Sequence, residues 1–264
     1  MVRLAMVGAG LMGEAILSGL LAAGWASADI VICDQRAERV TQLQDRYGVQ
    51  GAELADAAGA ARTVLLAVKP ADVAGVLDVL RPALGADTLV LSILAGVTLA
   101  TLESGVHDGT PVVRAMPNTP ARVGQGVTAI SSGTHVTDDH LAEVGEILGA
   151  VGGVITVAEK YQDSVTAVSG SGPAYLFLVA EALIEGGVHV GLPRDVAREL
   201  AVQTLHGSAT LLRDTGDHPT LLREAVTSPG GTTAAALRAL EDHGVRAAFL
   251  AAVEAARDRS LELG

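Results

Sequence analysis

A glycine turn near the start of the chain limits the possible fold most strongly. The apolar run Leu4–Val7 leads directly into Gly8-Ala9-Gly10-Leu11-Met12-Gly13, and a segment of helical period follows over Leu11–Ala23. In a strand-turn-helix unit the first glycine makes the tight turn, the second lets a pyrophosphate approach the backbone, and the third lets helix and strand pack closely. The helix N-terminus then faces the phosphates. A chance glycine turn is the alternative, but the strand-turn-helix context predicts a dinucleotide site at residues 8–12.

The first part of the chain predicts a doubly wound, Rossmann-type α/β sheet over residues 1–158. Short apolar runs rich in β-branched residues alternate there with longer segments of helical period, which is typical of parallel βαβ units. The first five runs are almost continuously apolar, as expected for strands covered by helices on both faces. The runs are Arg3–Val7, Asp29–Cys33, Thr63–Val68, Thr88–Leu94, Pro111–Met116, Val127–Ser131 and Val154–Val157.

The remainder, residues 159–264, predicts a second, all-helical domain bounded at each helix by Gly or Pro. Two of its helices carry apolar residues around most of their circumference, which a domain of this size cannot bury alone. We therefore expect a homodimer in which the helices of two chains cover each other. The predicted helices are Gln162–Val168, Pro173–Gly191, Pro193–Thr215, Pro219–Val226, Thr232–His243 and Val245–Leu263.

Composition narrows the class of protein further. The formal net charge of -12 repels a nucleic-acid backbone, so we expect no nucleic-acid partner. The single cysteine, Cys33, lies in an apolar run and fits a small buried strand residue in a reducing, cytoplasmic protein. Glu14 interrupts the N-terminal stretch that resembles a secretory signal, and the most apolar run, Ala174–Ile184, is short and carries Glu181. We expect no membrane span, and the scattered histidines predict no metal site.

Three segments after predicted strands complete the expected cofactor site. The Asp34 carboxylate can accept hydrogen bonds from the adenosine ribose hydroxyls, which favours NADH. Arg36, which follows Gln35, can instead bind the 2′-phosphate of NADPH. The expected cofactor is therefore NADPH or NADH. Asp34 has an alternative role as a helix N-cap. Ligands bind outside the carboxyl ends of strands, so we expect Ala67-Val68-Lys69-Pro70 and Ala95-Gly96 to line the nicotinamide. An ordinary surface lysine is the alternative for Lys69.

A second glycine-rich loop lies between two predicted helices of the second domain. Ser228-Pro229-Gly230-Gly231-Thr232-Thr233 combines backbone N–H groups and hydroxyls at a helix start, which suits an anion such as a carboxylate. The alternative is a turn followed by an ordinary helix, with Thr232 or Thr233 as the N-cap. Both interpretations stay open on the residues alone.

Five motifs, in order and spacing, resemble those of the Δ1-pyrroline-5-carboxylate reductase family. They are Gly8-Ala-Gly-Leu-Met-Gly13, Ala67-Val-Lys-Pro70, Arg114-Ala-Met-Pro-Asn-Thr-Pro120, Ser169-Gly-Ser-Gly-Pro-Ala-Tyr175 and Thr227-Ser-Pro-Gly-Gly-Thr-Thr233. The resemblance covers essentially the whole chain, and the last two motifs are the specific ones. It implies reduction of the cyclic imine 1-pyrroline-5-carboxylate to L-proline, the last step of proline biosynthesis. It also implies a dimer, with larger rings of dimers in some members.

The resemblance implies roles for individual residues. Thr233 matches the threonine near the substrate ring nitrogen and is the expected catalytic residue, while Ser228, Gly230, Gly231 and Thr232 would hold the carboxylate. Glu159 matches an acidic position that contacts the product; a charge at a helix N-terminus is the alternative. Asn118 borders the nicotinamide in this interpretation, with a turn role as its alternative. Glu53-Leu54-Ala55 stands where several relatives carry Asn near the adenosine, so the residue beside the adenine is unassigned.

Two rival classes share parts of this pattern. A related imine or β-hydroxyacid dehydrogenase would have the same two-domain plan, but the hydroxyacid enzymes use a lysine on the first long helix of the second domain. This chain has no lysine between Ser169 and Gly191. A non-catalytic nicotinamide-binding regulator would share the glycine turn but has no need for the loop Ser228–Thr233. The absence of the lysine and the presence of the loop both favour imine reduction.

Overall fold

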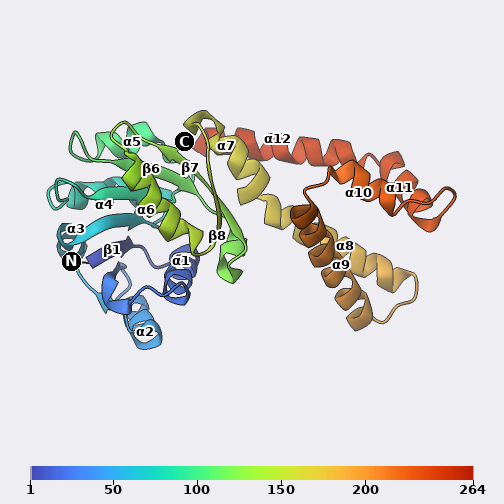
Figure 1. Ribbon diagram of the computed structural model, residues 1–264, viewed down its shortest axis with the longest axis horizontal. Helices are drawn as coiled ribbons and strands as arrows, with labels where there is room; N and C mark the ends of the chain where they lie inside the picture. Colours follow the sequence, from blue (N-terminus) through green and yellow to red (C-terminus); the bar gives the residue numbers. More distant parts are fainter. Residues whose placement is uncertain (1, 264) are drawn as a thin grey trace. The chain divides into compact units, whose positions relative to one another are not determined.

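The computed structural model describes residues 2–263, and its contacts divide the chain into two compact units (Figure 1). We call residues 1–171 together with 256–264 the sheet unit, and residues 172–255 the helical unit. The predicted Rossmann-type sheet followed by an all-helical region is confirmed. The predicted domain boundary between residues 158 and 159 stays a prediction.

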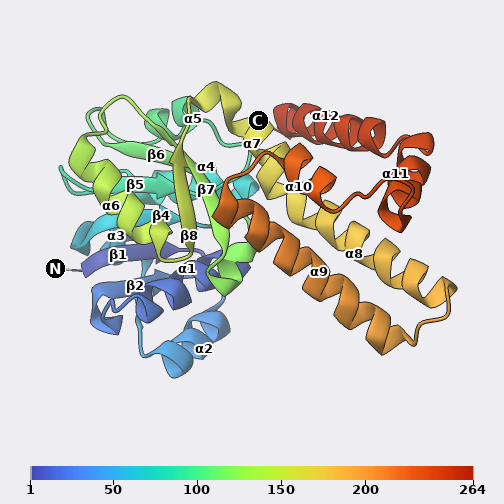
Figure 2. The same ribbon diagram turned by 45° about the vertical axis from the view of Figure 1, so that its right-hand side comes forward.

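The sheet unit is built on one sheet with the strand order β3-β2-β1-β4-β5-β6-β7-β8, of which Figure 2 labels every strand except β3. Pairing is parallel from β3 through to β6, which is the doubly wound arrangement. The order reverses between β1 and β4, and such a reversal opens a crevice at the carboxyl ends of the strands. In the described chain the strands are β1 Val2–Val7, β2 Ile30–Cys33, β3 Gln50–Gly51, β4 Ala61–Leu66, β5 Leu89–Ser92, β6 Val112–Met116, β7 Gly126–Ser132 and β8 Gly152–Thr156.

Helices cover both faces of this sheet, and the apolar strands explain why. Successive side chains of a strand point to opposite faces. In β1, Leu4 and Met6 belong to a buried cluster with residues of α1, α2 and α6, whereas Ala5 and Val7 belong to a second cluster with residues of α3, α4 and α5. The helices of this unit are α1 Leu11–Ala22, α2 Ala37–Tyr47, α3 Leu54–Ala60, α4 Val73–Leu80, α5 Leu99–Ser104, α6 Asp138–Gly149 and α7 Gln162–Val165.

One strand departs from the expected parallel pattern. β7 pairs antiparallel with β6, so the expectation of parallel βαβ units throughout residues 1–158 is wrong at this point. The reason is the connection: the chain between β6 and β7 holds only the short 3₁₀ helix Thr119–Val123. A parallel neighbour needs a crossover of a dozen or more residues. The next connection contains α6, and β8 is parallel to β7.

The helices after residue 159 agree with the predicted ranges to within two residues at most ends. They are α8 Gly172–His189, α9 Arg194–Thr215, α10 Pro219–Ala225, α11 Thr232–Asp242 and α12 Val245–Leu263. The first predicted helix is the exception. It is divided into α7 and a π-helical turn over Thr166–Gly170.

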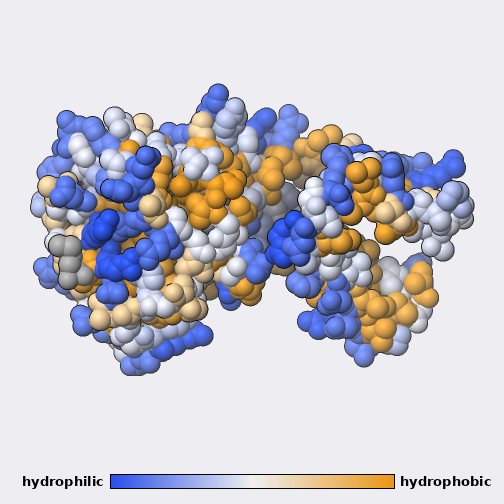
Figure 3. Space-filling view, in the orientation of Figure 1, coloured by the Kyte–Doolittle hydropathy of each residue, from blue (hydrophilic) through white to orange (hydrophobic). Residues whose placement is uncertain are grey.

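The helical unit leaves most of its apolar side chains uncovered within one chain. Of residues 172–255, all of which the structure describes, only Ala197 and Ala201 are buried. Leu176, Phe177 and Leu178 on α8 are each more than half exposed. Figure 3 shows apolar side chains gathered over the ends of α8 and α9. A face of this size needs a partner surface, as expected for a dimer.

The same exposed segment corrects one expectation. Among the described residues, the helical stretch Glu159–His189, with 31 residues, is long and apolar enough to cross a membrane by length and composition. The expectation that no run approaches this length is therefore wrong by that test. A single helix of this kind also occurs in soluble proteins. An apolar helix that a partner chain covers has the same composition.

Leu65 of β4 tests the packing of the sheet unit, because its side chain is fully buried. Leu65→Ala should lower the free energy of unfolding by about 2–5 kcal/mol, since it removes buried methyl groups and leaves a cavity. Chemical denaturation measures the change. Val123→Ala is the control, because Val123 is 74% exposed and should change this free energy by less than about 0.5 kcal/mol. Equal losses in both variants would contradict the assigned core.

Candidate functional site

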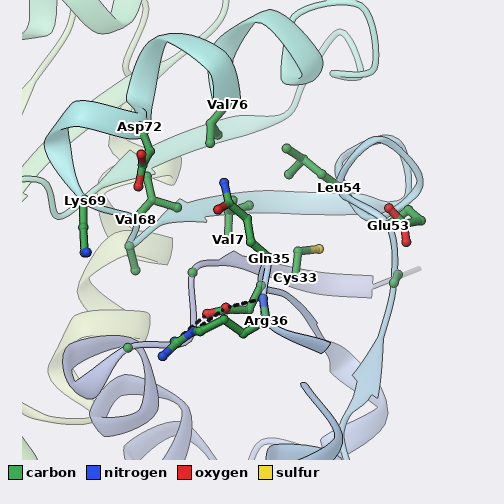
Figure 4. A pocket seen from close by; sticks show the side chains of 15 residues that line it. Val7, Cys33, Gln35, Arg36, Glu53, Leu54, Val68, Lys69, Asp72 and Val76 are labelled. Atoms are coloured by element: carbon green, nitrogen blue, oxygen red, sulfur yellow. Dashed lines mark hydrogen bonds and ion pairs between the residues drawn. The ribbon is translucent and has the colours of Figure 1, made fainter. Parts of the chain in front are cut away.

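A cavity of about 530 Å³ lies at the carboxyl ends of three neighbouring strands (Figure 4). The parallel ladders align these ends, because Val7 of β1 stands beside Cys33 of β2 and Leu66 of β4. We call it the strand-end cavity. Its lining residues are Val7, Gly8, Gly10, Cys33, Asp34, Gln35, Arg36, Ala52, Glu53, Leu54, Ala67, Val68, Lys69, Asp72 and Val76.

The strand-end cavity brings together eight of the residues predicted to bind the cofactor. These are Gly8, Gly10, Asp34, Gln35, Arg36, Ala67, Val68 and Lys69. The other seven lie outside its lining: Ala9, Leu11 and Met12 belong to the glycine turn and the first turn of α1, Pro70 begins a 3₁₀ helix, Ala95 and Gly96 follow β5, and Asn118 follows β6. The cavity therefore unites the residues predicted for the pyrophosphate and the adenosine ribose with three of those predicted to line the nicotinamide, Ala67, Val68 and Lys69. Contacts of any of these residues with a cofactor stay a prediction.

The structure gives a different reason for a glycine at each of the three glycine positions of the turn. Gly8 has φ +93°, and a Cβ there would lie 2.6 Å from the carbonyl oxygen of Ala67, so only glycine fits. A Cβ on Gly13 would lie 2.7 Å from the carbonyl oxygen of Gly8, so this position needs a glycine for close packing of helix and turn. Gly10 lines the cavity, and a Cβ there would meet nothing within 4 Å. Open space at Gly10 is what the approach of a pyrophosphate requires.

Asp34 is held by the glycine turn and by Arg36. Its Oδ2 accepts a hydrogen bond from the Ala9 N–H at 2.8 Å, and its Oδ1 accepts one from the Arg36 N–H at 3.0 Å. The Arg36 guanidinium donates to both carboxylate oxygens, at 3.0 and 3.1 Å. Burial opposes ionisation, but these hydrogen bonds outweigh it and lower the pKa of Asp34 to about 2. Asp34 is thus a carboxylate at neutral pH.

The helix-cap alternative for Asp34 is wrong. The N-cap of α2 is Arg36, and no side chain caps this helix. Asp34 instead lies at the end of β2, as a ribose-binding carboxylate does. Arg36 is exposed but paired with Asp34, so binding a 2′-phosphate would require its guanidinium to leave or share that carboxylate.

The Glu159 carboxylate makes two hydrogen bonds within the sheet unit. Its Oε1 accepts hydrogen bonds from the Leu99 N–H at the start of α5, at 2.6 Å, and from the buried Arg114 guanidinium of β6, at 3.1 Å. Glu159 therefore stabilises the N-terminus of α5, which follows the segment that carries Ala95 and Gly96. These contacts support the alternative in which Glu159 acts as a charge at a helix N-terminus, and the helix is α5. A contact between Glu159 and product stays a prediction.

Asn118 also has a structural partner. Its Oδ1 accepts a hydrogen bond from the Val127 N–H at 2.9 Å, which ties the loop after β6 to the beginning of β7. This contact supports the turn role. A position beside the nicotinamide stays a prediction.

In the helical unit, the loop before α11 has no side-chain cap. Gly231 is the N-cap and is extended, so the alternative with Thr232 or Thr233 as the cap is wrong. These two threonines are the first two residues of α11, and Gly230 has φ +70°. A helix start without a side-chain cap leaves its first backbone N–H groups available to an anion. The geometry agrees with the anion-binding interpretation of Ser228–Thr233.

Comparison with known proteins places this arrangement in a family. A family model described as pyrroline-5-carboxylate reductase dimerisation matches residues 159–263, and one described as NADP oxidoreductase coenzyme F420-dependent matches residues 3–96. A pyrroline-5-carboxylate reductase of Corynebacterium melassecola is 46% identical over 268 residues, covering 100% of this chain and 99% of the relative. The chain belongs to the pyrroline-5-carboxylate reductase family.

Solved structures of this reductase family have the same fold. The pyrroline-5-carboxylate reductase of Coxiella burnetii has a TM-score of 0.94 at 35% identity, covering 100% of this chain and 98% of that one. The Plasmodium falciparum pyrroline carboxylate reductase, solved with NADP bound, has a TM-score of 0.89 at 30% identity, with the same coverage. The two-domain plan that the motifs implied is therefore confirmed.

Part of the strand-end cavity was not predicted from the sequence. Ala52, Glu53, Leu54, Asp72 and Val76 line it without having been assigned to the site. The first three follow β3, a two-residue strand too short to give a periodic signal. The departure from Asn at residues 53–55 was the available clue.

Cys33 also lines the cavity, although it is buried as expected. Burial, followed by the nearby Glu53 carboxylate, raises the pKa of the Cys33 thiol to about 11. The thiol is thus protonated at neutral pH and unsuited to act as a nucleophile. Among the residues that the structure describes, no three His, Cys, Asp or Glu side chains group as metal ligands would.

Asp34→Asn tests the candidate cofactor site. The substitution removes the charge that suits ribose hydroxyls and also weakens the restraint on Arg36, so NADH should lose about tenfold in affinity and NADPH less. Fluorescence titration with each reduced cofactor measures the two dissociation constants. Equal losses for both would mean that Asp34 acts only by holding the turn through Ala9.

Proposed function

We propose that this chain reduces 1-pyrroline-5-carboxylate to L-proline with NADPH or NADH, the last step of proline biosynthesis. The observation that carries the proposal is that a cavity suited to a dinucleotide lies in a chain that matches these reductases from end to end. The residues fit such a cofactor, because Gly10 leaves open space at the turn and Asp34 is ionised at the end of β2. The NADP in the Plasmodium falciparum relative supports the class of cofactor.

The proposed reaction assigns one role to each part of the second loop. A bound reduced nicotinamide supplies a hydride to the imine carbon, and the ring nitrogen takes a proton, so that the C=N bond becomes a C–N single bond. Thr233 donates a hydrogen bond at the ring nitrogen and helps to deliver that proton. Ser228, Gly230, Gly231 and Thr232 hold the substrate carboxylate at the start of α11. The imine nitrogen is basic enough to need no strong acid from the protein.

The proposed assembly is a homodimer, in some conditions a larger ring of dimers, in the cytoplasm and without a nucleic-acid or membrane partner. The match to a dimerisation domain over residues 159–263 supports the dimer. The exposed apolar side chains of α8 support it independently, because burial against a second chain would remove them from water.

An enzyme assay tests the proposed function. Purified protein with 1-pyrroline-5-carboxylate and either NADH or NADPH should lose the absorbance of the reduced nicotinamide, with formation of an equal amount of proline. The ratio of kcat/KM for the two cofactors gives the preference. No substrate-dependent loss of absorbance with either cofactor would contradict the proposal.

Thr233→Ala tests the catalytic assignment. Removing the hydroxyl should lower kcat by about tenfold to a hundredfold, because proton delivery at the ring nitrogen loses its donor, while affinity for the cofactor changes little. Thr233→Ser is the matched control, since it keeps a hydroxyl and should retain most of kcat. Steady-state kinetics of both variants with unchanged kcat and KM would show that Thr233 has no role in the reaction.

A further inference from the structure

Two charged side chains, Asp34 and Arg39, form hydrogen bonds with the N–H and the carbonyl group of the same residue of the glycine turn, Ala9. The N–H of Ala9 donates to Asp34 at 2.8 Å, and the carbonyl oxygen of Ala9 accepts a hydrogen bond from Nε of Arg39 at 2.7 Å. Asp34 comes from the end of β2, and Arg39 comes from the first turn of α2. Both contacts are part-buried, so they are stronger than equivalent contacts in water.

The contact of Arg39 determines where the next N–H group points. The carbonyl of Ala9 and the N–H of Gly10 belong to one peptide plane, and in a trans peptide these two groups point in opposite directions. A carbonyl fixed on Arg39 therefore fixes the N–H of Gly10 on the side away from Arg39. Gly10 lines the strand-end cavity and has open space around it. An oriented backbone N–H in such a place is a donor for a phosphate oxygen.

Arg39 also neutralises a carboxylate that would oppose an anion at this turn. Glu14 lies in the first turn of α1, and Arg39 donates a second hydrogen bond to its Oε2. Arg46 and Tyr47 donate to Oε1 of Glu14, at 2.8 and 3.1 Å. The hydrogen bond from Arg39 outweighs burial and holds the pKa of Glu14 below its usual value. The glutamate is thus ionised, and the part-buried Arg39 compensates its charge more strongly than the exposed Arg46 does.

We propose that Arg39 is a positioning residue for the pyrophosphate of the bound dinucleotide. Arg39 is not one of the residues that line the cavity, and acts by orienting the Ala9–Gly10 peptide and by compensating Glu14. The proposal rests on the dinucleotide binding of the proposed function. Because NADH and NADPH share the pyrophosphate, Arg39 affects both equally, whereas Asp34 distinguishes them at the ribose.

Arg39→Met tests the proposal, because it removes the hydrogen bonds and keeps an apolar stem of similar length. The dissociation constants of NADH and NADPH should both rise about tenfold, the loss expected from one hydrogen bond to a charged group. In steady-state assays the KM for the cofactor should rise by the same factor, with kcat at saturating cofactor and the KM for the imine unchanged. A merely structural role would lower kcat as well and alter the imine KM.

Arg46→Met is the matched control. Arg46 also pairs with Glu14, but the hydrogen bond to the Ala9 carbonyl comes from Arg39. The Arg46 variant should therefore change both dissociation constants by less than about twofold. Arg39→Lys keeps the positive charge but lacks the guanidinium that reaches both Ala9 and Glu14, so it should weaken the affinity for both dinucleotides by a smaller factor. This variant replaces Arg39→Met in the test if Arg39→Met does not fold. Unchanged affinities in the Arg39 variants, or equal losses in the Arg46 variant, would overturn the proposal.

The experiment separates this inference from the proposed function. Binding of neither dinucleotide by the wild-type protein would refute both. Normal binding by the wild type together with normal binding by the Arg39 variants would refute the inference alone. Thermal unfolding of each variant confirms that the compared proteins are folded.

Discussion

The alignment of strand ends in the parallel sheet is the constraint on which the rest of the site depends. Val7 of β1 is in register with Cys33 and Leu66, so the turn after β1 begins where its two neighbours also end. Gly8 then passes so close to the Ala67 carbonyl that no side chain fits. Every other feature of the strand-end cavity follows: Asp34 reaches the Ala9 N–H, and Gly10 is left facing open space.

Most of the fold could be predicted from the sequence, for reasons that particular elements show. The ends of β1 and β4 are apolar and buried because helices cover both faces of the sheet, and a Gly or Pro stands at or just before the start of each helix from α8 onward. β3 has two residues and gives no pattern. The direction of β7 could not be predicted from its own residues, because strand direction depends on the connection before it. There the chain has a short 3₁₀ helix instead of a crossover.

The candidate site was predictable where backbone geometry demands a residue type, and less so where side chains meet from separate elements. Gly8 and Asp34 have positions that follow from the strand-turn-helix pattern. Arg39 had no signal, because an arginine on an amphipathic helix usually faces solvent, and its contact with Ala9 joins residues 30 positions apart. Glu159 was assigned to the product by resemblance, but its observed partners are Leu99 and Arg114, which belong to strands and helices that come together only in the folded chain.

A crystal structure of the protein with NADPH or NADH bound would show whether the pyrophosphate lies against the glycine turn. Phosphate oxygens should lie within hydrogen-bond distance of the Gly10 N–H and the first N–H groups of α1, with Asp34 beside the adenosine ribose and Arg39 still hydrogen-bonded to the Ala9 carbonyl. A dinucleotide bound elsewhere, or a turn whose Ala9–Gly10 peptide has rotated away from Arg39, would contradict this arrangement.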